Sequence, residues 1–249
     1  MTRLNHVSRG GGGPKAGAIA AVEAAAAAAH ISFRNERAAT KAGRSRTIER
    51  DMKRAVLAAA LLPGLVIAAS FDPGKTLGGT QAPIVLEVFS SFDCPHCREL
   101  HDDVLPLLVR DYVVGGRVCV VNREFPLAGP GHPYAREAAL YATAAARIGK
   151  YSVVADALWK YQGTWAINGQ VWETVATVLT AAEQKKVQSL SKDPGVEAEV
   201  RRDVDDATRD GVDRTPTIFI TANGRRFPLP GGVPNYELLS SVLNHYLGR

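Results

Sequence analysis

Residues 82–97 read APIVLEVFSSFDCPHC, and this stretch decides which fold the chain adopts. Its first part, residues 84–89, is apolar and β-branched apart from Glu87. Such a run is typical of a central strand that is buried on both faces. After a short turn, a helix is predicted over residues 94–110, with a kink at Pro106. The chain is therefore expected to pass from a buried strand, through a short turn, into a helix.

The predicted helix begins with Cys94-Pro95-His96-Cys97. Unpaired backbone N–H groups and the helix dipole favour a negative charge at Cys94, so its thiol pKa is expected to lie below the ordinary value of about 8.5. We predict that Cys94 is the exposed, attacking sulfur, that Cys97 resolves the mixed disulfide, and that His96 donates to the Cys94 sulfur. The pattern indicates thiol-disulfide redox chemistry or metal binding.

Three further residues receive structural interpretations. Asp93 is predicted to cap the helix, which would direct its charge away from a thiolate. Cys119 lies among valines and is predicted to be a buried, small hydrophobic residue. His132 is predicted to belong to the turn that precedes the helical part of the chain, with a place in a groove near Cys94 as the alternative.

The rest of the chain alternates between strands and helices. The predicted elements are a second strand at 118–123, helical segments over about 133–210, a hairpin at 217–229 and a last helix at 235–247. Breaks in the helical part are expected near residues 163–169 and at Pro194. This order predicts an α/β fold in which a helical subdomain is inserted after the second strand.

Residues 82–97 resemble the active-site region of the DsbA family of bacterial periplasmic oxidoreductases, and Pro95-His96 is the dipeptide that DsbA itself carries. The resemblance takes in residues 123–127 and 211–220 and covers the chain from about residue 77 to its end. It implies a thioredoxin-like central sheet with the inserted helical subdomain at about residues 133–210.

The resemblance also gives a role to Thr215-Pro216. In the family the proline at this place is cis and faces the CxxC pair, so Thr215 is expected to pair with an extended substrate peptide through its backbone. From the residues alone, an ordinary trans bond leading into a strand remains the alternative.

Glu87 interrupts an apolar strand, and an unpaired carboxylate is costly to bury. In the DsbA family a glutamate at the matching position lies beneath the CxxC pair and helps to move protons. The resemblance therefore implies that Glu87 relays the proton of Cys97. The alternative is a solvated glutamate at the edge of the sheet.

The N-terminal part differs in composition from the rest. Residues 1–51 carry nine Lys and Arg against four acidic residues and are predicted to be disordered or a misassigned extension, with translation starting at Met52. Residues 52–70 have the basic start, apolar middle and small last residues of a signal peptide, with a membrane anchor as the alternative. The thioredoxin-like domain is expected over residues 71–249.

The charge distribution argues against nucleic acid as a partner. The chain carries a net charge of +5, but its basic excess lies before residue 55, so the predicted domain lacks the positive surface that phosphate binding requires.

The leading hypothesis is an exported, periplasmic or extracytoplasmic, monomeric thiol-disulfide oxidoreductase that uses the Cys94-Cys97 disulfide and no dissociable cofactor. The expected partners are unfolded or partly folded exported proteins and, from the resemblance, a membrane thiol oxidase that passes electrons to quinone. Three alternatives remain: a periplasmic reductase or isomerase, a copper-binding module in which Cys94 and Cys97, with His96 as a candidate third ligand, hold Cu(I), and a holdase.

Overall fold

The computed structural model describes residues 72–230 and 232–249. The predicted extension over 1–51 and the predicted signal peptide over 52–70 lie outside the described residues. Within the described part of the chain, no helix is long and apolar enough to cross a membrane.

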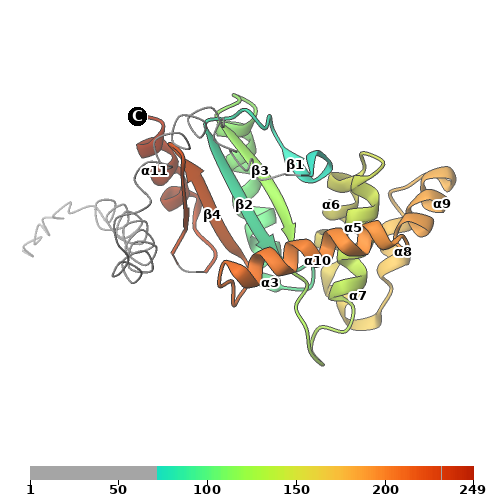
Figure 1. The fold of residues 1–249 in the computed structure, drawn as a ribbon. Coiled ribbons are helices and arrows are strands. Elements are labelled where there is room, and N and C mark those ends of the chain that lie inside the picture. The colour runs from blue at the N-terminus through green and yellow to red at the C-terminus, as the bar shows by residue number, and fades with distance from the viewer. Residues whose placement is uncertain (1–71, 231) are drawn as a thin grey trace, which may run out of the picture.

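A mixed sheet of five strands forms the centre of the domain (Figure 1). The strands are β1 (Thr76–Leu77), β2 (Ile84–Ser90), β3 (Val118–Glu124), β4 (Thr217–Ala222) and β5 (Arg225–Pro228). Their order is β1-β3-β2-β4-β5; β2 pairs in parallel with β3, and the other neighbours are antiparallel. The central position predicted for the apolar strand is confirmed, because β2 lies in the middle and six of its residues are buried. The short edge strand β1 was not predicted.

Side chains alternate between the two faces of β2, and each face is covered differently. Leu86 and Val88 pack in one core with the helical segment that follows the CxxC pair and with α11 (Tyr236–Tyr246). Phe89 lies on the opposite face and packs with Ala207 of α10 (Pro194–Arg209). Figure 1 shows α10 running from the inserted helices across to the sheet.

The helix after the CxxC pair is longer and less regular than predicted. It consists of α3 (Pro95–Glu99), the π-helical turn η3 (Leu100–Val104), α4 (Leu105–Leu108) and the π-helical turn η4 (Val109–Val113). The Leu105 N–H bonds to the carbonyl of Leu100, five residues earlier. A π-helical turn is a common way for a helix to adjust around a proline, which cannot donate a backbone hydrogen bond. The irregularity expected at Pro106 therefore takes this form.

The predicted helical insert is confirmed. Between β3 and β4 lie α5 (Ala135–Ala146), α6 (Tyr151–Lys160), α7 (Gln162–Asn168), α8 (Val171–Ala176), α9 (Ala181–Leu190) and α10. The break expected near residues 163–169 is confirmed at Gly169, where α7 ends with a positive φ of 76°, but it is wrong for the rest of the interval, which is helical. The helix boundary expected at Pro194 is correct, since this proline lies in the first turn of α10.

The C-terminal elements agree with the sequence patterns. Asn223 and Gly224 have φ values of 51° and 71° and connect β4 to β5. Positive φ at both central residues is what a tight hairpin turn of this kind requires, and Asn-Gly adopts it readily. Helix α11 starts after Asn235, whose side chain accepts a hydrogen bond from the Leu238 N–H and caps the helix.

Candidate active site

Cys94 and Cys97 lie where the sheet meets the insert. Both cysteines pack in the core of the inserted helices, together with Phe92 and Trp159. Cys94 is the N-cap residue of α3, and Pro95 occupies the first turn. The backbone N–H at this position makes no bond within a helix, so the proline, which lacks it, costs no hydrogen bond. The backbone N–H groups of the first turn are thereby directed toward the Cys94 end of the helix.

The Cys94 sulfur is surrounded by hydrogen-bonding groups. It lies 3.4 Å from the carbonyl oxygen of Thr215. The hydrogen bond with the Cys97 side chain is the largest cause that lowers the pKa of Cys94, and the Thr215 side chain and the backbone N–H groups of Cys97 and His96 act in the same direction. These interactions outweigh burial, which raises the pKa, and bring it to about 5.

Cys97 is shifted the other way. Its thiol is 1% exposed, and burial is the main reason why its pKa lies far above the ordinary value, with the hydrogen bond and charge of Cys94 acting in the same direction. The two thiols are both free, so the structure describes the reduced dithiol. One sulfur of the pair thus favours the thiolate and the other keeps its proton.

The prediction that Cys94 is exposed is wrong, because the residue is only 5% exposed. The insert contributes to this burial through α7, where the Gln162 side-chain amide donates to the carbonyl oxygens of Phe92 (2.6 Å) and Cys94 (3.0 Å). Trp159 of α6 packs on Phe92 with ring centroids 4.5 Å apart. Gln162 was not predicted, since nothing in its local sequence marks an amide that reaches a turn about seventy residues away.

The role expected for the His96 ring requires a correction. The imidazole is exposed, and its Nδ1 lies 3.4 Å from Oε2 of Glu99 one turn along the helix. The group of His96 that lowers the pKa of Cys94 is its backbone N–H. In this conformation the ring is directed along the helix rather than toward the sulfur.

Thr215 and Pro216 lie opposite the start of α3. The peptide bond between them is cis, as the resemblance predicted. Strand β4 begins at the next residue and pairs with β2, and this pairing brings Thr215 beside Cys94 although they are 121 residues apart. The Thr215 hydroxyl oxygen is buried.

Glu87 is buried and doubly paired, so the alternative of a solvated glutamate is wrong. Its carboxylate accepts hydrogen bonds from Arg123 (3.0 Å) and Arg226 (2.5 Å). It alternates along β2 with Leu86 and Val88, which face the CxxC helix, so it lies on the α10 side of the sheet. The proton relay from Cys97 through Glu87 stays a prediction.

Further buried charges complete this group of contacts. Asp203 of α10 accepts hydrogen bonds from Arg123 (2.9 Å) and from Lys75, and Arg226 also pairs with Asp210. We call the side chains of Lys75, Glu87, Arg123, Asp203 and Arg226 the sheet ion cluster. Its members come from five separate stretches of sequence, and only charged residues within apolar strands, such as Arg123, hinted at it.

Glu124 lies next to the sheet ion cluster and is completely buried. Its backbone N–H donates to Asp203, and its carboxylate accepts a hydrogen bond of 2.8 Å from the Tyr151 hydroxyl. Burial is the main cause that raises the pKa of Glu124 to about 7.

Asp93 does not cap the helix, contrary to the prediction, because the N-cap position belongs to Cys94 and no side chain caps it. The carboxylate of Asp93 instead accepts a hydrogen bond from the Ser91 hydroxyl (2.5 Å) and lies 2.6 Å from Nδ1 of His132. His132 lies on the loop between β3 and α5, which accords with the predicted turn before the insert. This contact also brings it next to the residue that precedes Cys94.

Comparison with known proteins identifies the family of the chain. The model of a family described as thioredoxin matches residues 72–244. The chain is 26% identical over 165 residues to a probable disulfide bond formation protein D of Bacillus anthracis, covering 62% of this chain and 72% of that protein. It is also 31% identical over 185 residues, 72% of this chain, to the Na(+)/H(+) antiporter NhaA 3 of Salinispora tropica, of which it spans only 26%.

Among solved structures, a variant of alpha-DsbA1 from Wolbachia pipientis superimposes with a TM-score of 0.59 at 21% identity, covering 70% of this chain and 90% of that one. This likeness concerns the fold. Together with the family match, it confirms the thioredoxin-like sheet with a helical insert that the sequence predicted. The resemblance to DsbA-like proteins is confirmed by the similarity to the disulfide bond formation protein.

Proposed function

This chain belongs to the thioredoxin family, and from that premise we propose that it is a DsbA-like protein thiol-disulfide oxidoreductase. It introduces or exchanges disulfide bonds in extracytoplasmic proteins through the Cys94-Cys97 couple. The observation that carries the proposal is the opposite shift of the two thiols, with the pKa of Cys94 lowered to about 5 and that of Cys97 raised.

The oxidising reaction has two exchanges. A substrate thiolate attacks the Cys94 sulfur of the protein disulfide, the bond to Cys97 breaks, and Cys97 leaves and takes up a proton. A second substrate thiolate then attacks the substrate sulfur of the mixed disulfide, and Cys94 leaves as a thiolate. The substrate loses two electrons and gains a disulfide, and the protein becomes the dithiol.

The asymmetry of the pair favours this direction. A thiol of low pKa is a good leaving group, and stabilising its thiolate stabilises the reduced form of the protein, which makes the disulfide a stronger oxidant. Cys97, whose pKa is raised, is suited to hold a proton after it leaves. Glu87 is proposed to help to move that proton.

The partners follow from the same proposal. The backbone of Thr215 would pair with an extended segment of an unfolded or partly folded exported protein, next to the reacting sulfur. A membrane thiol oxidase would reoxidise the dithiol. The protein would act as a monomer in the periplasm or another extracytoplasmic compartment and would need no dissociable cofactor.

The decisive experiment is the equilibrium reduction potential of the Cys94-Cys97 couple against glutathione, with Cys94→Ser as the control. We expect a value well above that of thioredoxin, toward about −120 mV. A value near about −270 mV would instead support a reductase. Failure to form the intramolecular disulfide, with stoichiometric Cu(I) binding that Cys94→Ser abolishes, would support the copper-binding alternative.

A further inference from the structure

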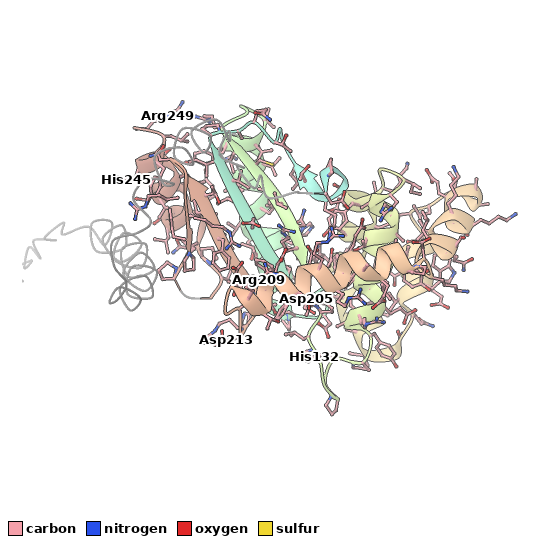
Figure 2. The ribbon with its side chains drawn as sticks, in the orientation of Figure 1. His132, Asp205, Arg209, Asp213, His245 and Arg249 are labelled. Atoms are coloured by element: carbon pink, nitrogen blue, oxygen red, sulfur yellow. The ribbon has the colours of Figure 1, made fainter. Side chains whose placement is uncertain are left out.

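The residue before the reactive cysteine carries a buried carboxylate. The Asp93 side chain is 4% exposed. Among the described residues its hydrogen-bond and ion-pair partners are the Ser91 hydroxyl at 2.5 Å and Nδ1 of His132 at 2.6 Å. His132 is one-third exposed and lies on the loop between β3 and α5 (Figure 2).

A buried negative charge next to the reactive cysteine would oppose the redox chemistry. A like charge disfavours the ionised form of a neighbouring group, and the effect is larger where water is excluded. Asp93 is bonded directly to Cys94 along the chain, and the sulfur of Cys94 is itself buried. An uncompensated Asp93 carboxylate would therefore destabilise the thiolate on which an oxidising couple depends.

We propose that His132 is a positioning residue of the redox site, whose cationic imidazole offsets the charge of Asp93 and so keeps Cys94 stable as a thiolate. The inference rests on the proposed function, because it concerns the reduction potential of the same couple. It assigns to the β3–α5 loop a part in setting that potential.

The loop is held against the active-site turn by a second contact, which fixes the geometry of the pair. The Leu127 N–H donates to the Ser91 hydroxyl oxygen at 3.0 Å, and the Ser91 hydroxyl donates to Asp93. Ser91 and Asp93 thus bind the loop near both of its ends. An ion pair between partners held in this way loses less side-chain entropy than one between free surface groups.

Other ionisable groups around the sulfur have their own partners. On α3, Cys97 interacts with Cys94 directly, and His96 is paired with Glu99 in solvent. In the loop before Pro216, Asp213 and Arg214 pair with each other and are both 70% exposed. These exposed groups are screened by water, whereas the Asp93 carboxylate is not.

The test combines two substitutions in a double-mutant cycle. His132→Asn keeps an N–H donor at the position of Nδ1, and hence the bond that holds the loop, but removes the cation. Asp93→Asn removes the negative charge. The readouts are the pH dependence of Cys94 thiolate absorbance and the glutathione equilibrium of the full-length protein. The matched control is His101→Asn, because His101 also pairs with a carboxylate, that of Asp156, which is 67% exposed.

We expect His132→Asn to raise the pKa of Cys94 by about one unit. The glutathione equilibrium should shift about tenfold toward the protein disulfide, which corresponds to about 30 mV. His101→Asn should change the acid dissociation constant of Cys94 and the glutathione equilibrium constant by less than about twofold each, since the carboxylate that pairs with His101 is exposed. In the Asp93→Asn background, His132→Asn should have no further effect, because the charge that it offsets is gone.

Three results would overturn the inference. One is an unchanged Cys94 pKa and potential in His132→Asn, and another is an equal shift in the Asp93→Asn background. The third is a raised Cys94 pKa in Asp93→Asn alone, which remains measurable if His132→Asn does not fold. In each case a wild-type protein that still oxidises dithiols through Cys94 leaves the proposed function intact, so the two failures are distinguishable.

Discussion

The redox site and the sheet ion cluster both bury ionisable groups near β2, but they neutralise charge differently. In the cluster, each of Glu87 and Asp203 lies within 3.0 Å of an arginine, and Lys75 adds a further cation. At the redox site, the Cys94 sulfur is stabilised by the Cys97 thiol, the Thr215 side chain and backbone N–H groups.

This difference separates a structural arrangement from a reactive one. A charge that is matched by fixed opposite charges cannot be removed without leaving its partners unpaired in a dry environment. A thiolate that is stabilised by neutral donors loses its charge when the disulfide forms. The donors carry no charge themselves, so no unpaired charge is left buried. Substitutions in the cluster should therefore act on stability, and substitutions at the cysteines should act on redox chemistry.

The largest effect is expected for Cys97→Ala. Without the second sulfur the protein cannot form its disulfide, so catalytic oxidation of a dithiol peptide should fall to background while the fold persists. The peptide oxidation rate and the thermal unfolding midpoint check this. Cys119→Ala is the control, because Cys119 is fully buried in β3 and should leave activity unchanged. Substantial turnover by Cys97→Ala would contradict the two-cysteine mechanism.

In the sheet ion cluster, Arg123→Met should lower the free energy of unfolding by about 3–5 kcal/mol, because it leaves the buried carboxylates of Glu87 and Asp203 without their shared guanidinium. The reduction potential should stay within experimental error. Urea unfolding and the glutathione equilibrium measure the two quantities. Arg214→Met, which breaks an exposed pair, is the matched control and should leave both unchanged. If Arg123→Met were as stable as the wild type but had an altered reduction potential, the cluster would have a redox role and not a structural one.

Glu124 gives the cluster region a pH signature. Its folded pKa of about 7 exceeds the ordinary glutamate value of 4.5, so the folded protein keeps a proton that the unfolded chain releases. Stability should therefore fall as the pH rises from 4.5 to 7, by about 3 kcal/mol relative to Glu124→Gln. Unfolding of both proteins in urea across this range checks the difference. Parallel curves would show that Glu124 does not titrate as described.

Cys94 should change the stability with pH in the opposite direction to Glu124. Its folded pKa of about 5 lies below the ordinary cysteine value of 9.0, so the reduced protein should gain stability as the pH rises between these values and lose it as the pH falls through 5. From pH 6 to pH 8 the gain relative to Cys94→Ser should be about 2 kcal/mol. Urea unfolding under reducing conditions measures it, and a constant difference between the two proteins would contradict it.

The smallest redox effect is expected for Glu87→Gln. If Glu87 relays the proton of Cys97, the exchange rate with glutathione should fall by about tenfold. This is less than the roughly 10²–10⁴-fold of a direct general acid or base, because Glu87 lies on the face of the sheet opposite the CxxC helix and would act indirectly. The potential should stay constant. Stopped-flow exchange kinetics measure the rate, and Glu197→Gln, an exposed partner of Arg136, serves as the control. An unchanged rate would assign Glu87 to the ion cluster alone.

Much of the fold followed from local patterns. The apolar run at β2, the Asn-Gly turn and the alanine-rich helices each reflect preferences that act over a few residues, and they appear where predicted. The break expected near residues 163–169 occurs only at Gly169, because Gly163 is accommodated inside the short helix that ends there. The glycines alone did not show which one ends the helix.

The candidate site was predictable only in part. Cys94 and Cys97 were identified because a CxxC pair at the start of a helix has a local physical meaning. The burial of Cys94 and its contact with Gln162 were not predicted, since they depend on how the insert packs on the active-site turn. The pairing of Asp93 with His132 was missed for the same reason, because 39 residues separate them.

The sequence by itself determined the order of the elements from β2 onward, the reactive pair and the cysteine that begins the helix, because these depend on side-chain periodicity and on the chemistry of neighbouring residues. Only the tertiary structure decided which charges are matched. The partners of Glu87 and Asp93 come from distant parts of the chain, and the energy of a buried charge depends on the distance to its partner and on the exclusion of water. Packing sets both quantities, and sequence spacing sets neither.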